Sequence, residues 1–344
     1  MIKVGISIGD PNGIGPEITL KALRDNRLLS SFIAVVYAST SVLKHYKKLI
    51  PEYNANYTKV SSVNSAKSKQ INLISVGHED FEINPGCPTN ESGAFSFSSL
   101  DHATKDLANG LIDVLVTAPI NKKFIQNKNF NFPGHTEYLT QLANLDESLM
   151  LMVMENLRVG VATNHIPLHN IKELLTQDII EKKLALLNQS LIVDFGILKP
   201  KIAVLGLNPH AGENGMLGDD ENEIIIPAIN SVKNKNILAF GPFPADGFFG
   251  SKNLFNYDGV LAMYHDQGLI PFKTIAQGRG VNFTAGLPIV RTSPDHGTAY
   301  DLVEKNIASE QSMRNAIYLA IDILNNRTLQ KKLSAKRLKT SSKA

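Results

Sequence analysis

Three stretches of sequence decide the fold, and each of them ends in histidine: Val159-Gly-Val-Ala-Thr-Asn-His165, Ile202-Ala-Val-Leu-Gly-Leu-Asn-Pro-His210 and Gly259-Val-Leu-Ala-Met-Tyr-His265. Each apolar run has the length of a buried strand, and a helical pattern follows at least the first two. Residues just past the carboxyl ends of parallel strands gather at one edge of an open α/β sheet, where ligands bind. The pattern therefore predicts three imidazoles at one edge of a mostly parallel sheet.

This placement of the histidines points to a metal site. Three imidazoles could ligate one divalent ion and leave a coordination position open for a substrate. Any one of them could also be an ordinary loop histidine, but three at the same place in the strand pattern favour a shared metal. Nitrogen ligands favour a transition metal such as Zn²⁺ or Co²⁺, while Mg²⁺ stays open.

The rest of the chain alternates strand-like and helix-like segments, which predicts two packed α/β lobes in a protein of 344 residues. Strand-like runs lie at residues 3–8, 33–37, 71–76, 114–117, 149–154, 159–163, 202–207, 237–240 and 260–264. Helical patterns lie at 17–23, at 42–49 with Ser41 as the cap, and at 97–109, 171–191 and 307–324. The polar segment 54–70 is interpreted as a surface excursion.

Composition describes a globular protein that does not cross a membrane. Hydrophobic residues make up 43% of the chain and charged residues 19%, and no apolar run reaches about 18 residues. The first residues lead directly into a strand and lack the layout of a signal peptide. Because the single cysteine, Cys87, cannot form an internal disulfide, we expect a cytoplasmic protein and interpret this thiol as a filler rather than a nucleophile.

The net charge of +3 is concentrated at the carboxyl terminus. From Arg327 onward the chain holds seven Lys and Arg and no acidic residue, which leaves 28 basic and 32 acidic residues in the rest. A basic tail could touch nucleic acid, but a frayed, solvated terminus is the favoured interpretation. The body shows no basic stripe interleaved with aromatic residues, so we expect no nucleic-acid partner.

Two loops that precede helical segments could bind an anion. The first, Gly9-Asp-Pro-Asn-Gly13-Ile-Gly15-Pro16-Glu17, offers backbone N–H groups, although a tight strand–helix turn would use the same residues. It matches neither the dinucleotide fingerprint nor a P-loop. In the second loop, His135 and Thr136 could hold a phosphate or carboxylate, or Thr136 could be a plain N-cap.

The segment from residue 265 to residue 301 is the densest in candidate binding residues. Lys273, Asn282 and Arg291 follow one another at even intervals among Gly and Pro. Arginine can bind a phosphate or a carboxylate through two parallel hydrogen bonds, and lysine adds a point charge. The hypothesis is an anionic substrate, although ordinary solvated loops contain the same residue types.

Six segments of the chain, in this order, resemble the 4-hydroxythreonine-4-phosphate dehydrogenase family of vitamin B6 biosynthesis. They are Ser7-Ile-Gly-Asp-Pro-Asn-Gly-Ile-Gly-Pro-Glu17, Thr117-Ala-Pro-Ile-Asn-Lys122, Gly134-His-Thr-Glu-Tyr-Leu139, Asn208-Pro-His-Ala-Gly-Glu213, Tyr264-His-Asp-Gln-Gly-Leu-Ile-Pro271 and Asp295-His-Gly-Thr-Ala299. The resemblance spans residues 3 to about 325. It implies the isocitrate/isopropylmalate-dehydrogenase type of α/β fold, with a cleft between residues 1–125 plus 280–344 and residues 126–279, the second lobe carrying metal ligands and dimer contacts.

The resemblance also implies a homodimer whose active site lies at the subunit interface. The family's metal ligands match His165, His210 and His265, with both subunits contributing. Its substrate contacts match His135, Thr136, Lys273, Asn282 and Arg291. The residues selected from the sequence pattern and those implied by the resemblance therefore coincide.

Members of the family oxidise 4-phosphooxy-L-threonine at its secondary hydroxyl with an NAD-type cofactor. The β-keto acid then loses carbon dioxide and gives 3-amino-2-oxopropyl phosphate. A divalent ion would help the alcohol lose its proton and would stabilise the enolate formed on decarboxylation, while Lys273 and Arg291 would neutralise phosphate and carboxylate. Asp246 and Asp266 are candidates for the general base, and either could instead orient a histidine.

For the cofactor, residues 295–302 resemble the adenosine-binding loop of isopropylmalate dehydrogenases. His296 and Asp301 are therefore expected to bind it, and a carboxylate at position 301 favours NAD over NADP because a 2′-phosphate would meet a like charge. The usual Ala-Gly-Lys-Gly is replaced by Val303-Glu304-Lys305-Asn306, which changes how a cofactor approaches. Gly247 also stands where threonine is common, so a hydroxyl contact is lost.

Other functions stay open at this point. Close relatives oxidise threonate or erythronate 4-phosphate. Nothing in the sequence identifies a carboxylate that would bind the ammonium group of phosphothreonine. Phosphate acyltransferases share a distantly related fold but need neither metal nor NAD, so the three histidines argue against them. A non-catalytic protein on this scaffold is least favoured, because Lys273, Asn282 and Arg291 accompany the metal ligands.

Overall fold

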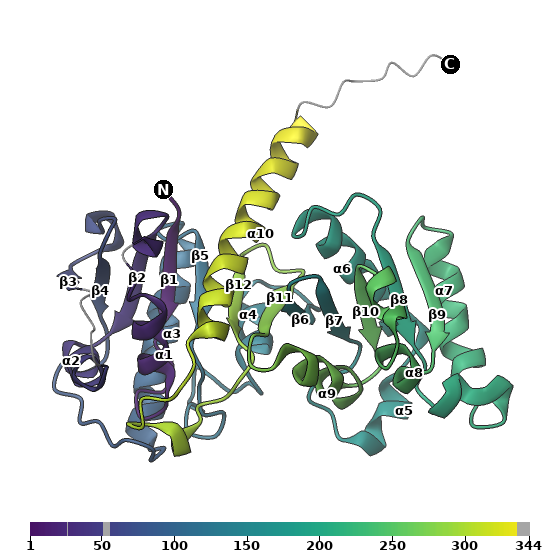
Figure 1. Ribbon diagram of the computed structural model, residues 1–344, viewed down its shortest axis with the longest axis horizontal. Coiled ribbons are helices and arrows are strands. Elements are labelled where there is room, and N and C mark those ends of the chain that lie inside the picture. Colours follow the sequence, from purple (N-terminus) through teal and green to yellow (C-terminus); the bar gives the residue numbers. More distant parts are fainter. Residues whose placement is uncertain (26, 51–55, 336–344) are drawn as a thin grey trace.

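One continuous sheet of twelve strands runs through the computed structural model, which describes residues 1–25, 27–50 and 56–335 (Figure 1). The strands are β1 (Lys3–Ser7), β2 (Ile33–Ala38), β3 (Tyr57–Val60), β4 (Ile71–Ser75), β5 (Val114–Thr117), β6 (Leu149–Met154), β7 (Leu157–Val161), β8 (Lys201–Leu205), β9 (Leu238–Phe243), β10 (Gly259–Ala262), β11 (Val281–Ala285) and β12 (Arg291–Pro294). Their order is β3-β4-β2-β1-β5-β12-β11-β6-β7-β10-β8-β9. Most neighbours are parallel, which confirms the predicted α/β class.

Helices cover both faces of this sheet. They are α1 (Gly15–Ala22), α2 (Thr40–Leu49), α3 (Asn90–Ala108), α4 (His135–Leu142), α5 (Ile171–Leu174), α6 (Gln177–Val193), α7 (Ile226–Lys233), α8 (Ala245–Phe249), α9 (His265–Ala276) and α10 (Gln311–Ala335). On one face, apolar residues of α1, α2, α6, α7 and α10 form one continuous core with the strands. On the other face the core is divided, one cluster lying under α3 and α4 and another under α8 and α9.

The three strands that precede His165, His210 and His265 lie side by side. β10 pairs in parallel with β7 on one side and with β8 on the other. Their carboxyl ends therefore share one edge of the sheet, as the apolar runs predict.

The middle of the sheet is antiparallel and was not predicted from the sequence. β11 runs antiparallel to both β12 and β6, and β6 runs antiparallel to β7. Neither β11 nor β12 has a continuous apolar run, because polar residues alternate with apolar ones along β11 and make up most of β12. This insertion joins the two parallel parts of the sheet.

Several predicted elements need correction. The side chain of Ser39, not Ser41, caps α2 by accepting from the backbone N–H of Val42. The predicted helix 171–191 is two helices, since Thr176 caps a new one. Part of the predicted surface excursion forms the edge strand β3, while residues 54 and 55 lie outside the described residues.

The carboxyl-terminal helix is longer than predicted, and its basic residues are not all frayed. Arg327 donates from Nε to Asp194 at 2.6 Å and from Nη1 to two backbone carbonyls. This part of the predicted tail is therefore anchored in the fold. Lys336, Arg337, Lys339 and Lys343 lie outside the described residues.

The strands of the two predicted lobes occupy opposite ends of the sheet. Residues 1–125 and 280–344 supply the neighbouring strands β3-β4-β2-β1-β5-β12-β11. Residues 126–279 supply the rest of the described sheet, β6-β7-β10-β8-β9. The lobe boundaries themselves stay a prediction. Within the described ranges, no helix is both long and apolar enough to span a bilayer.

Candidate active site

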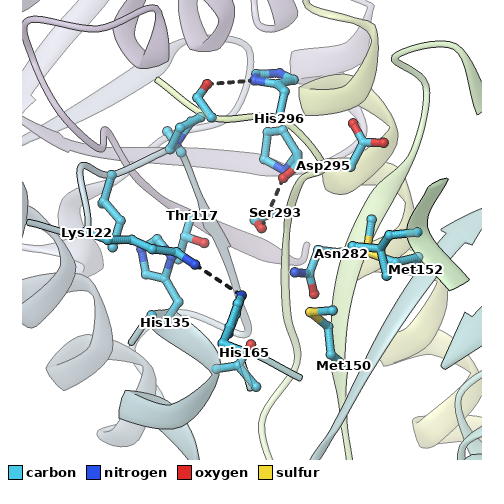
Figure 2. A pocket seen from close by; sticks show the side chains of 18 of the residues that line it. Thr117, Lys122, His135, Met150, Met152, His165, Asn282, Ser293, Asp295 and His296 are labelled. Atoms are coloured by element: carbon cyan, nitrogen blue, oxygen red, sulfur yellow. Dashed lines mark hydrogen bonds between the residues drawn. The ribbon is translucent and has the colours of Figure 1, made fainter. Parts of the chain in front are cut away.

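Most of the predicted binding residues line one cavity in the middle of the sheet. It has a volume of about 210 Å³ and is bordered by α4 and α9, on the face where the apolar core is divided (Figure 2). Eight predicted residues line it: His135, Thr136, His165, His265, Lys273, Asn282, Arg291 and His296. Four others do not: His210, Asp246, Asp266 and Asp301.

The antiparallel strands place polar side chains on the cavity wall. Successive side chains of a strand point to opposite faces. On β11, Asn282 lines the cavity while Phe283 is buried in the core. On β12, Arg291 and Ser293 line it, and Ser293 lies directly opposite Asn282. The polar residues that obscure these strands in the sequence therefore build the site.

Arg291 is a buried guanidinium that forms no ion pair within the described residues, although the charge of Glu137 acts on it. Its side chain is among the largest that are fully buried, with 2% of the residue exposed. Nε and Nη2 donate to Oγ1 of Thr117 at 3.0 and 2.6 Å, and Nη1 donates to Oγ1 of Thr284 at 3.3 Å. No carboxylate of the described chain forms an ion pair with it, and burial lowers the pKa of Arg291 to about 9. Because an unpaired buried charge is costly, this wall is suited to an anion.

His135 and Asn282 present polar atoms that have no partner in the described chain. Burial, together with the charges of Arg291 and Lys122, lowers the pKa of His135 well below 6.5, so the ring is neutral. Its Nε2 and the Oδ1 of Asn282 are shielded from solvent and unbonded. Buried polar atoms normally find a partner, so both are available to a ligand.

Thr136 is not the N-cap of α4. Gly134 occupies that position and makes no side-chain cap. The Thr136 hydroxyl lies instead 3.4 Å from that of Thr284, which also accepts from Arg291. Thr136 is thus part of the polar wall that surrounds the guanidinium.

His165 and His265 lie close together, with ring centroids 5.6 Å apart. Nδ1 of His265 bonds to Oδ1 of Asp266 at 2.7 Å, and Nδ1 of His165 faces Oε1 of Glu137 at 3.5 Å. An ionised carboxylate only accepts hydrogen bonds, so both Nδ1 atoms carry the proton and both Nε2 atoms offer a lone pair. A histidine held by a carboxylate in this way is typical of metal ligands.

The charge on Glu137 is compatible with this arrangement. Burial alone would raise its pKa, but the contact with His165 and the charge of Lys122 lower the pKa overall. Glu137 is therefore ionised at neutral pH and able to orient the imidazole. Two imidazoles of one chain thus suit a divalent metal.

His210 does not join this pair within one chain. It lies in the segment η4 (Pro209–Gly215), where His210 and the four residues after it have positive φ angles. It lines another cavity, of about 520 Å³, together with both candidate bases, Asp246 and Asp266. Within the described residues, no group of three or more His, Cys, Asp or Glu side chains could hold a metal ion. The described chain by itself therefore brings together two of the three predicted ligands, His165 and His265.

The two predicted cofactor residues lie on one segment but in different surroundings. His296 lines the cavity, whereas Asp301 lies outside it in the short turn η7 (Tyr300–Leu302). The amino-terminal loop packs on this segment, where the Tyr300 hydroxyl donates to buried Asp10 at 2.7 Å. Burial raises the pKa of Asp10. The loop that was considered as an anion site therefore supports the candidate cofactor segment.

Sequence reasoning missed three charged residues of the cavity: Lys122, Glu137 and Asp295. All three lie within motifs that carry the family resemblance, but nothing in their spacing indicates a role. Thr117, which bonds Arg291, was missed as well. It ends the strand predicted at 114–117, so the strand-end rule that selected the histidines could have found it.

Comparison with solved structures defines the class of fold. An isocitrate dehydrogenase from Methylococcus capsulatus aligns with a TM-score of 0.51 at 13% identity, covering 97% of this chain and 89% of that chain. A branched-chain phosphotransacylase from Enterococcus faecalis aligns with a TM-score of 0.56 at 12% identity, covering 94% and 100%. At such low identity the likeness concerns the fold alone. It confirms the isocitrate-dehydrogenase type of α/β fold.

Closer matches identify the family. A crystal structure of a 4-hydroxythreonine-4-phosphate dehydrogenase from Klebsiella pneumoniae has a TM-score of 0.81 and 35% identity, covering 94% of this chain and 100% of that chain. The enzyme of the same name from Bacteroides thetaiotaomicron is 45% identical, covering 96% of this chain and 91% of its own length. The family model described as pyridoxal phosphate biosynthetic protein PdxA matches residues 31–320. The chain therefore belongs to the PdxA family of oxidoreductases.

One relative carries a different name. A protein from Oceanobacillus iheyensis, provisionally named a D-threonate 4-phosphate dehydrogenase, is 36% identical and covers 93% of this chain and 97% of its own length. Membership of the family thus leaves a choice between phosphorylated substrates.

The neutral state of His135 predicts a loss of stability in acid. Its folded-state pKa is lowered, so below pH 6.5 the unfolded chain binds a proton that the folded chain does not. Lowering the pH from 7.5 to 5.5 should reduce the free energy of unfolding of the wild type by about 1.4 kcal/mol more than that of a His135→Gln variant. Urea unfolding of both proteins at the two pH values, in metal-free buffer, measures the difference. Parallel pH profiles would show that His135 titrates normally.

Proposed function

We propose that the chain is an NAD-dependent, divalent-metal-dependent dehydrogenase that oxidises 4-phosphooxy-L-threonine and decarboxylates the product to 3-amino-2-oxopropyl phosphate. The observation that carries this proposal is Arg291, a buried guanidinium with no carboxylate partner, in a cavity that Lys273 also lines. A phosphate group would neutralise both cations. Relatives named for this activity match nearly the whole chain.

In this proposal, the phosphate lies between Arg291 and Lys273. His135 and Asn282 bond the ligand through the polar atoms that have no partner in the free chain. These contacts fix the end of the substrate that does not react. The reacting carbon is thereby held toward the segment of His296, which lines the same cavity.

His165 and His265 would hold the metal through Nε2, with Glu137 and Asp266 fixing their orientation. Zn²⁺ or Co²⁺ suits nitrogen ligands better than Mg²⁺ does. When bound, the metal would supply a Lewis acid that favours loss of the alcohol proton and accommodates the negative charge formed on decarboxylation.

We further propose a homodimer in which His210 of the partner subunit completes the metal site. This accounts for a histidine at the predicted strand end that lines a different cavity of its own chain. Asp246 lines that cavity too and is exposed, so it would arrive with His210. Asp266 is already bonded to His265. Asp246 is therefore our candidate for the base that takes the alcohol proton.

The cofactor is proposed to be NAD, bound at the segment of His296 and Asp301. Asp301 is exposed and ionisable, so it could accept from ribose hydroxyls and would repel a 2′-phosphate. NADP is the alternative. We keep the prediction of a cytoplasmic enzyme, for which the lone Cys87 is the support.

A phosphorylated sugar acid, threonate or erythronate 4-phosphate, is the second candidate substrate. The relative from Oceanobacillus iheyensis favours it, and the same phosphate and metal contacts would serve it. An acyltransferase is less favoured, since the likeness to a phosphotransacylase concerns the fold alone.

The first test is NADH formation at 340 nm by purified protein with NAD and Zn²⁺, Co²⁺ or Mg²⁺. We expect turnover of 4-phosphooxy-L-threonine that stops on addition of a chelator. 4-Phospho-D-erythronate and D-threonate 4-phosphate are assayed in parallel. Turnover of a sugar acid alone would keep the mechanism and change the substrate, and inactivity with all three would refute the proposed dehydrogenase.

The shared metal site predicts complementation between inactive variants. His265→Ala and His210→Ala should each abolish turnover and leave the fold intact. After dissociation and random reassociation of the two proteins, half of the dimers are mixed and one of their two sites is complete, so about a quarter of the wild-type activity should return. A mixture of His165→Ala with His265→Ala is the matched control and should stay inactive. If the mixture of His265→Ala with His210→Ala regained no activity, the proposed sharing of the metal site between two subunits would be wrong.

A further inference from the structure

We propose that Lys122 is a further catalytic residue, whose ammonium group pairs with the substrate carboxylate that leaves as carbon dioxide. The inference rests on the proposed function and concerns a residue that sequence reasoning did not select. This ammonium group lies 3.1 Å from Nε2 of His165 and so contacts the lone pair that a metal would use on this proposed ligand. Metal binding would therefore release it to the substrate.

The backbone of Lys122 is held in place while its side chain reaches into the cavity. Oδ1 of Asn121 accepts from the backbone N–H groups of Lys123 and Phe124 at 3.0 and 3.2 Å, which forms a tight turn. Nε2 of Gln126 donates to the carbonyl of Lys122 at 2.7 Å. The turn follows β5, so the lysine is presented from the strand that also ends in Thr117.

The ammonium group of Lys122 contacts His165 (Figure 2). Nζ lies 3.1 Å from Nε2 of His165. An ammonium group has only donors, so Nε2 is the acceptor, and its lone pair is the one that a metal would use. Nζ and a metal ion cannot share it. Occupation of the metal site therefore requires Lys122 to rotate away, within a cavity that it already lines.

The charges of the cavity favour a carboxylate as the new partner. Lys122 has no ion pair in the described chain. Its charge acts on Glu137, but Oε1 of Glu137 contacts Nδ1 of His165, at 3.5 Å. Arg291 and Lys273 belong to other walls, on β12 and α9, and are proposed to hold the phosphate. The remaining anionic group of 4-phosphooxy-L-threonine is its carboxylate. Lys122 is the remaining cation of the described cavity wall.

The covalent structure of the substrate makes this pairing reachable. A single carbon, C2, separates the carboxylate carbon C1 from the hydroxyl-bearing carbon C3, and the phosphate lies on the far side of C3. If C3 is directed toward His165 and His265, the carboxylate, two bonds away from C3, would lie near these histidines. The Lys122 side chain, which contacts His165, could then reach it.

The same cation would serve both stages of the reaction. In the proposed reaction, C3 would first lose hydride to bound NAD, and the base would take the hydroxyl proton. The C1–C2 bond then breaks, its electron pair forms the C2–C3 double bond, and the negative charge moves from the carboxylate to the oxygen on C3. Carbon dioxide leaves, and C2 takes a proton from solvent. An ammonium group near both oxygens stabilises the charge before and after this transfer.

The test compares Lys122→Met with Lys123→Met, a neighbouring lysine whose Nζ lies over the ring of Phe124 instead of lining the cavity. Two ligands are used: 4-phosphooxy-L-threonine and 1-amino-3-phosphooxypropan-2-ol, which is the same molecule without the carboxylate. For Lys122→Met we expect the KM of the first to rise roughly 10- to 100-fold. The inhibition constant of the second should change less than about twofold, because the lost contact is to the carboxylate. The Lys123 variant should match the wild type with both ligands.

A second readout uses the metal alone. Calorimetric titration of Zn²⁺ into the substrate-free proteins should show binding to Lys122→Met at least as tight as to the wild type, because a competing cation has been removed from His165. Weaker Zn²⁺ binding, or equal weakening toward both organic ligands, would reduce Lys122 to a structural support and overturn the proposal. If the wild-type protein turned over none of the substrates, the proposed function itself would be refuted. Failure of the Lys122 proposal and failure of the proposed function are therefore distinguishable.

Discussion

A buried positive charge that no ion pair within the described chain neutralises is the constraint around which the site is built. Arg291 is carried into the interior by β12 and held there by the hydroxyls of Thr117 and Thr284, which accept three of its hydrogen bonds. The charge of Glu137 acts on it from across the same cavity without forming an ion pair. Such a group destabilises the free protein. The antiparallel insertion in an otherwise parallel sheet serves to present it between the two divided cores. An anionic ligand would offset that cost, and a phosphorylated substrate provides one.

The metal pair depends on a second constraint, the direction of hydrogen bonds. Glu137 and Asp266 face the Nδ1 atoms of His165 and His265, which leaves each Nε2 with a lone pair. Lys122 donates to one of these lone pairs. In the proposed site, metal, substrate carboxylate and lysine would therefore be linked, because a metal at His165 would free Lys122 for the carboxylate. Such a site would recognise the metal and the substrate together rather than separately.

Much of the fold follows from local physics, and the remainder depends on contacts between distant segments. Parallel strands such as 114–117 and 260–262 are continuous apolar runs and were predictable. β11 and β12 were not, because Asn282 and Arg291 break the apolar pattern in order to face the cavity. The strand-end rule correctly predicted that the three strands preceding the histidines share one edge of the sheet. It cannot give the direction of a side chain, and the turn of positive φ angles at His210 takes that ring to another cavity. The roles of Lys122 and Glu137 arise only from their spatial neighbours.

Replacement of Arg291 by methionine, followed by thermal unfolding with and without inorganic phosphate, tests the central claim most directly. If the guanidinium is an unpaired charge that awaits an anion, Arg291→Met should be as stable as the wild type or more stable, by up to about 4 kcal/mol, in phosphate-free buffer. Phosphate should then raise the melting temperature of the wild type but not of the variant. A variant that unfolds more easily without phosphate, yet is still stabilised by phosphate as much as the wild type, would contradict the account.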